Sequence, residues 1–155
     1  MSFNQAAVNS LFAQVVSDVM TLGIFETVNS HEPKSAPQNG LVASVWMDSI
    51  TPTGRASGLA SISGVVTLNI RCYSSMLQQP LDAIDPNLMT AASAILNQFS
   101  GEFTLGGTVR DIDLLGMYGK PLSAQAGYIN VDNKMFRVMT IMVPVIINDM
   151  FTEVP

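Results

Sequence analysis

The chain has little of what catalytic and metal sites are built from. It contains one cysteine, Cys72, and one histidine, His31. One cysteine excludes an intramolecular disulfide, and one residue of each kind is too few for a Cys/His zinc site. The alternating strand pattern around Cys72 predicts a buried, apolar role for it. His31 lies in a loop, and the chain has neither a Gly-x-Ser-x-Gly elbow nor an activated cysteine, so we interpret it as solvated or structural. We therefore expect no bound metal, no cofactor and no enzyme activity.

Charged residues are also scarce, at 12% of the chain against about a quarter in typical domains. Apolar residues make up 48%, so much of the polar surface must come from Ser, Thr, Asn and Gln. Such a surface favours burial against other subunits, because the interfaces of obligate oligomers are depleted of charge. The net charge is −5 and no run of Lys or Arg occurs, which argues against binding nucleic acid through its phosphates.

Long hydrophobic runs are absent as well. The longest, residues 141–147, is interrupted by Pro144 and is far shorter than the roughly 20 residues that span a bilayer. The N-terminus has neither a basic flank nor a continuous apolar segment, so we expect no signal peptide. We therefore expect a protein that is made in a cytoplasm-like compartment and does not bind a membrane.

What the sequence does contain is two amphipathic helix patterns. The first begins at a capping box formed by Ser2 and Gln5 and ends at Gly23. The second is predicted to start with Asp85 as its N-cap and Pro86 at the first helical position. It closes at residues 100–101. Each pattern has one apolar stripe, which predicts packing on a sheet.

Strand patterns fill the rest of the chain. We predict strands at residues 24–29, 41–49, 64–73, 103–105 and 108–115, and a hairpin over residues 125–147 with a tight turn at Asp132 and Asn133. Asn148 and Asp149 should end the last strand, leaving residues 151–155 as a frayed tail. The order predicts a single α+β domain over residues 1–150, in which two helices pack on a mostly antiparallel sheet.

Residues 50–63 are rich in Gly, Ser, Thr and Pro and are long for a connection between strands. We predict a loop or hairpin arm that contacts a neighbouring subunit or a partner protein of the assembly, and a mobile surface loop is the alternative. The candidate contact residues are Thr53, Arg55, Ser57 and Leu59.

Asp111 and Asp113 are two residues apart in a predicted strand, so both should project to one side. Such a pair can bind a metal or divide acid and base roles, and an enzyme using both with His31 is one hypothesis. They can equally form a solvated face, or a subunit boundary with basic residues of a neighbour. The candidates for that boundary are Arg71, Arg110 and Arg137.

Several segments follow one another in a specific order. They are the His31-Glu-Pro-Lys34 loop, Asn39-Gly-Leu-Val-Ala-Ser-Val-Trp-Met47, residues 65–73 followed by Ser74-Ser-Met-Leu77, Asp82-Ala-Ile-Asp-Pro86, Gly101-Glu-Phe-Thr-Leu-Gly-Gly107, Leu114-Leu-Gly-Met-Tyr-Gly119, and Pro121-Leu-Ser-Ala-Gln-Ala-Gly-Tyr128 before the final hairpin. Over residues 5–150, this order resembles the tail terminator proteins of long-tailed bacteriophages, particularly those that infect actinobacteria.

The resemblance implies a structural virion protein with no catalytic residues. Such proteins form a hexameric ring that caps the head-proximal end of the tail tube, stops tube growth and joins the tail to the neck. The implied partners are other copies of the chain, the tail tube protein and the neck or head–tail connector proteins, and the predicted arm is expected to contact a neighbouring subunit or the tail tube. The implied location is the virion tail, after synthesis in the bacterial cytoplasm. The alternative is another ring-forming part: a head–tail connector, a tail tube subunit or a baseplate subunit.

A ring of this kind must let genomic DNA pass without specific binding. Because clustered Lys and Arg would hold the phosphates, we predict a lumen with more Asp and Glu than Lys and Arg. Asp111 and Asp113 are candidates to line it. The same two residues at a subunit boundary remain the alternative.

Overall fold

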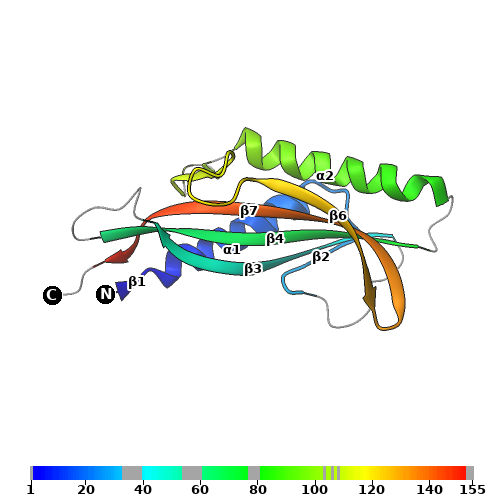
Figure 1. Ribbon diagram of the computed structural model, residues 1–155, viewed down its shortest axis with the longest axis horizontal. Coiled ribbons are helices and arrows are strands. Elements are labelled where there is room, and N and C mark those ends of the chain that lie inside the picture. Colours follow the sequence, from blue (N-terminus) through cyan, green and yellow to red (C-terminus); the bar gives the residue numbers. More distant parts are fainter. Residues whose placement is uncertain are drawn as a thin grey trace.

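The computed structural model describes residues 2–32, 40–53, 61–76, 81–102, 104–105, 107 and 109–152. In this part of the chain, two α-helices pack on one seven-stranded sheet, which confirms the predicted α+β class (Figure 1). The strand order is β1-β7-β4-β3-β2, and β5 and β6 also pair with β7. All described pairs are antiparallel except β2 with β3.

Helix α1 (Gln5–Thr21) does not begin as predicted. Its N-cap is Asn4, whose side-chain oxygen accepts a hydrogen bond from the Ala7 N–H at 3.1 Å. The predicted cap, Ser2, instead belongs to strand β1 (Ser2–Phe3), which pairs with the end of β7. The predicted end is confirmed: Gly23 follows the C-cap in a left-handed conformation (φ +69°).

Helix α2 (Ile84–Gly101) follows a short 3₁₀ helix, η1 (Leu81–Ala83). Its N-cap is Ala83, which makes no side-chain capping bond, so the predicted Asp85 cap was wrong. Asp85 lies in the first turn, and its carboxylate accepts a hydrogen bond from Arg137 Nε at 2.9 Å. Pro86 lies in the same turn, where its missing N–H is not needed.

The centre of the sheet is formed by β3 (Leu41–Thr53), β4 (Ser61–Ser75) and β7 (Lys134–Thr152). Strands β3 and β4 are longer than predicted and include both ends of the predicted arm. Residues 54–60 of that arm lie outside the described residues. The predicted strand 24–29 is shorter than expected, since β2 is only Thr27–Asn29.

Two other strand predictions failed. Residues 104–105 form a turn, and only β5 (Asp111–Ile112) remains of the strand predicted at 108–115. The chain leaves β5 because the Asp113 carboxylate binds backbone N–H groups of the loop that follows.

The final hairpin is confirmed, with β6 (Ser123–Val131) turning at Asp132 and Asn133, both at positive φ (55° and 62°). Strand β7, however, does not stop at Asn148 and Asp149. Its register against β4 shifts there, Asp149 adopts φ +55°, and the strand continues to Thr152. Of the predicted tail, residues 151–152 are therefore strand, and residues 153–155 lie outside the described residues.

Both helices cover the same face of the sheet, with α1 near β3 and β2, and α2 over β7 and β4 (Figure 1). Their apolar stripes enclose one core with alternate residues of the strands. Its fully buried members include Leu11, Val15, Leu68, Ile70, Cys72, Ile95, Phe99 and Ile141. The opposite face carries a smaller cluster of Val42, Tyr73, Phe136 and Val138, in which the two aromatic rings meet edge to face. No described helix covers this second face.

Cys72 should be unreactive while the chain is folded. It has no exposed surface, and burial raises the pKa of its thiol from 9.0 to about 12. That shift lowers the thiolate fraction at pH 8 by about a thousandfold. We expect a maleimide or iodoacetamide to label Cys72 only as fast as the chain unfolds, with complete labelling in denaturant. Rapid labelling of the native protein would contradict this.

Candidate assembly surface

Arg71 lies in the middle of the helix-free face of the sheet. Its Nε donates a hydrogen bond to Thr140 Oγ1 at 3.0 Å, and its guanidinium carbon lies 5.0 Å from the centre of the Trp46 ring. Its terminal nitrogen lies 3.8 Å from a carboxylate oxygen of Glu32. Stacking, hydrogen bonding and ion pairing therefore hold this side chain in place within one chain.

Around Arg71, this face carries the uncharged polar side chains of Ser44, Thr67 and Asn69. Ser44 has no exposed surface, and its hydroxyl oxygen has no hydrogen-bond partner among the described residues. A face of this composition can be buried by another protein at low cost, because few charges have to be desolvated.

Residues 114–121 form a loop that Asp113 closes. The Asp113 side chain is only 5% exposed, and its two carboxylate oxygens accept hydrogen bonds from the Met117 and Tyr118 N–H groups at 2.8 and 2.9 Å. Its own N–H donates to the Pro144 carbonyl, and its carbonyl accepts from the Leu122 N–H. The carboxylate is thus committed to organising the loop.

This loop presents a large apolar side chain to the surface. Leu115 is 85% exposed. Next to it, Gly116 has φ +74°, and a Cβ there would lie 3.0 Å from the Pro121 nitrogen, so the turn requires glycine. Met117 of the same loop is 62% exposed, so the loop carries two large exposed apolar side chains and is a candidate contact surface.

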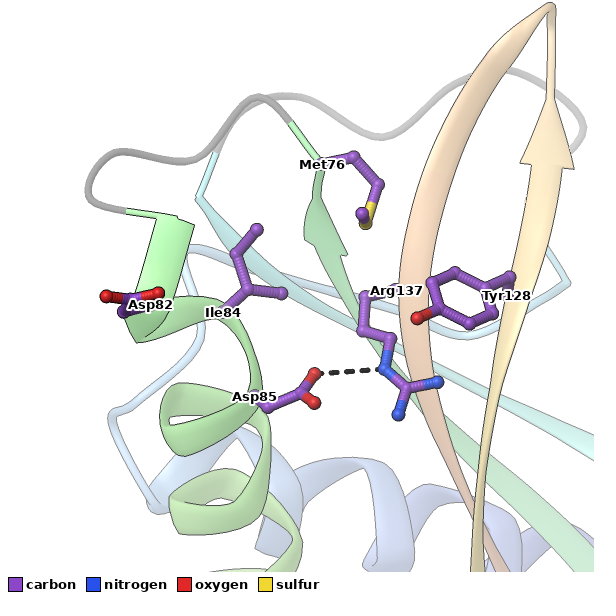
Figure 2. A pocket seen from close by; sticks show the side chains of 6 residues that line it. All are labelled: Met76, Asp82, Ile84, Asp85, Tyr128 and Arg137. Atoms are coloured by element: carbon purple, nitrogen blue, oxygen red, sulfur yellow. Dashed lines mark hydrogen bonds and ion pairs between the residues drawn. The ribbon is translucent and has the colours of Figure 1, made fainter.

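A third feature lies where the first turn of α2 meets the β6–β7 hairpin. Figure 2 shows the side chains that line a pocket of about 380 Å³: Met76, Asp82, Ile84, Asp85, Tyr128 and Arg137. Arg137 donates to Asp85 through Nε and to the Gly127 carbonyl through a terminal nitrogen at 3.1 Å. Its guanidinium lies 4.5 Å from the centre of the Tyr128 ring, and the hydrogen bond with Asp85 raises its pKa further.

The structure separates the residues that the sequence singled out as candidate charges. Arg71 and Arg137 lie on opposite faces of the sheet and pair with Glu32 and Asp85 of the same chain. Exposed Arg110 donates to the Asn148 side chain at 3.2 Å.

The two predicted aspartates differ in surroundings. Asp111 is half-buried in β5, and its Oδ1 has no hydrogen-bond partner among the described residues. Asp113 follows the last residue of β5, and its carboxylate binds the loop of residues 114–121. Thr53 is the last residue of β3, whereas Arg55, Ser57 and Leu59 lie outside the described residues.

Two of these features were missed by the sequence analysis: the Arg71–Glu32–Trp46 arrangement and the exposed Leu115. The loop had a local signal, because Gly116, Gly119 and Pro121 within six residues are typical of turns. The Arg71 arrangement had none, because its members come from separate parts of the chain.

The described residues contain no group of three or more His, Cys, Asp or Glu side chains placed to hold a metal. Neither described helix combines the length and hydropathy that crossing a membrane requires. In comparisons with known proteins, neither family models nor curated sequences gave a match.

Proposed function

We propose that this chain is a structural subunit of a bacteriophage tail, the tail terminator. In this role, six copies form a ring at the head-proximal end of the tail tube, stop tube polymerisation and join the tail to the neck. The resemblance along residues 5–150 supports the proposal, and the α+β fold suits a small subunit that presents several surfaces. The observation that carries it is the exposed Leu115 on the loop closed by Asp113.

An exposed leucine on a pre-formed loop is suited to binding another protein. Burying a leucine side chain contributes about 1.5–3 kcal/mol, and a loop that is already ordered loses little entropy on docking. Other large apolar side chains are exposed on both helices and on the hairpin: Met20, Met89, Tyr128 and Met135. A ring subunit needs such distributed contacts, because it meets two neighbours, the tube and the neck.

Three basic residues already have acidic partners within the chain, which supports a ring that lets DNA pass. Arg71, Lys120 and Arg137 each lie within 4 Å of an acid of the same chain, namely Glu32, Asp48 and Asp85. Their charges are therefore largely balanced before any phosphate approaches, which weakens the attraction that would hold DNA.

We expect Leu115→Ser to fold normally but to assemble poorly. Losing the buried leucine should weaken each subunit contact by roughly ten- to a hundredfold. Native mass spectrometry should show six copies for the unchanged chain and smaller species for Leu115→Ser, with equal melting temperatures. Leu115→Met is the control, because it keeps an apolar side chain and should keep the ring. Rings of equal stability in all three would exclude this role for Leu115, and a chain that is monomeric in solution and in assembled particles would exclude the ring.

A phage that lacks the chain separates the proposal from its alternative. Loss of a terminator should give tails of uncontrolled length that fail to join heads. Tails of normal length beside unjoined, DNA-filled heads would point instead to a head–tail connector.

A further inference from the structure

Strand β6 has an open outer edge. It pairs with β7 along its whole length, and among the described residues no other strand lies along its outer side. Its sequence, Ser-Ala-Gln-Ala-Gly-Tyr-Ile-Asn-Val, contains no charged residue and no proline. An exposed edge without charge, proline or bulge is a template for pairing with another strand.

The hairpin turn determines which backbone groups point outward. With a two-residue turn, Val131 and Lys134 form the first hydrogen-bonded pair, and bonded pairs then alternate with non-bonded ones. Four residues of β6 lie in non-bonded pairs and direct their N–H and C=O groups away from β7: Ala124, Ala126, Tyr128 and Asn130. The same alternation turns the Met135 carbonyl of β7 away from β6. In agreement with this, that carbonyl accepts a hydrogen bond from the Met76 N–H, which lies on the β4 side of β7.

The opposite edge of the sheet is protected against pairing. Strand β2 covers the first part of β3, and a bulge interrupts β3 between Met47 and Ser49. Further along β3, Pro52 has no backbone N–H that could donate a hydrogen bond to another strand. Such features normally prevent the association of sheet edges. Among the described strands of more than three residues, β6 is therefore the one whose outer edge remains able to pair.

We propose that β6 pairs with β6 of a second copy of this chain, antiparallel, about a two-fold axis at Gly127. In this register, Ala124 lies opposite Asn130 of the second copy, and Ala126 lies opposite Tyr128. Every outward N–H and C=O of the four residues then gains a partner. The side chains also fit across the pairing, because Tyr128 and Asn130 face alanines, Ile129 faces Gln125, and Gly127 faces Gly127. No like charges meet.

This contact goes beyond the proposed function and does not depend on it. An isologous contact cannot join neighbours within a six-fold ring, which needs head-to-tail interfaces. The pairing would hold copies that are not neighbours in such a ring, including copies free in solution.

Cysteine cross-linking tests the register. The two Gly127 residues form a non-hydrogen-bonded pair with Cα atoms about 4.5 Å apart, within the range of a disulfide. A Cβ added at Gly127 meets only Val138 Cγ2 at 3.8 Å, so cysteine fits. Mild oxidation of Gly127→Cys should give a covalent dimer, without competition from buried Cys72.

Two matched variants serve as controls. Gln125 lies opposite Ile129 of the second copy, so Gln125→Cys alone should not cross-link, whereas a mixture of Gln125→Cys with Ile129→Cys should. If neither Gly127→Cys nor the mixture cross-links while the variants are folded, the proposal is wrong. Cross-linking of Gln125→Cys alone to the same extent as the mixture would also overturn the register.

The mass in solution tests the pairing itself. At protein concentrations at which no ring forms, we expect the unchanged chain to be a dimer by light scattering and Ala126→Pro to be a monomer. Proline removes an N–H that points away from β7, so the hairpin should persist with a similar melting temperature. A folded monomer of the unchanged chain, or a dimer of Ala126→Pro as stable as that of the unchanged chain, would refute the proposal.

Discussion

Replacing Phe99 by alanine should lower the free energy of unfolding by about 3–5 kcal/mol, the range for truncating a fully buried aromatic side chain. Phe99 has no exposed surface and lies near the end of α2, inside the core that both helices share with the sheet. Its loss leaves a cavity that neighbouring strands cannot close, because they are hydrogen-bonded on both sides. Since a domain of this size has about 5–15 kcal/mol of stability in total, the variant should be near the limit of folding.

Urea denaturation followed by circular dichroism measures this effect. Asn97→Ala is the control, because Asn97 is exposed on the same helix and should change stability by no more than about 0.5 kcal/mol. A loss below about 1 kcal/mol in Phe99→Ala would mean that α2 does not pack on the sheet as described.

The elements that could be predicted from the sequence are those that local chemistry determines. The apolar stripes of the two helices, the alternation in β4 and the turn at Asp132 and Asn133 depend on residues close together in the chain. Helix starts were less predictable, because several capping residues competed nearby. Asn4 caps α1 instead of Ser2, since Ser2 is taken up by pairing with Thr152 at the far end of the chain.

The errors arose where contacts between distant segments decide the outcome. Asp85 is an ordinary helix cap in sequence, but Arg137 lies close enough to bind its carboxylate. Residues 108–115 alternate like a strand, but the Asp113 carboxylate accepts hydrogen bonds from the Met117 and Tyr118 N–H groups, which an extended strand would place out of its reach. The candidate surfaces share this limit, because neither the Arg71–Glu32 pair nor the open edge of β6 follows from residues adjacent in sequence.

Asp113→Ala should have the second large effect and lower the free energy of unfolding by about 2–4 kcal/mol. Two hydrogen bonds to a buried carboxylate disappear, and the Met117 and Tyr118 N–H groups lose their acceptors. The stability of Asp113→Asn, which keeps one acceptor oxygen, should lie between that of the unchanged chain and that of Asp113→Ala. Hydrogen exchange of these two amides should accelerate, and chymotrypsin should cut faster after Tyr118. Asp111→Ala is the matched control. The Asp111 Oδ1 has no hydrogen-bond partner among the described residues, so this substitution should change the free energy of unfolding little.

If the closed loop positions Leu115 for assembly, Asp113→Ala should also weaken the proposed ring even where the rest of the chain stays folded, since an open loop must be ordered again on docking. The combined variant with Leu115→Ser should then assemble no worse than Leu115→Ser alone, because both changes remove the same contact. Additive losses would mean that Asp113 supports assembly through some other part of the molecule.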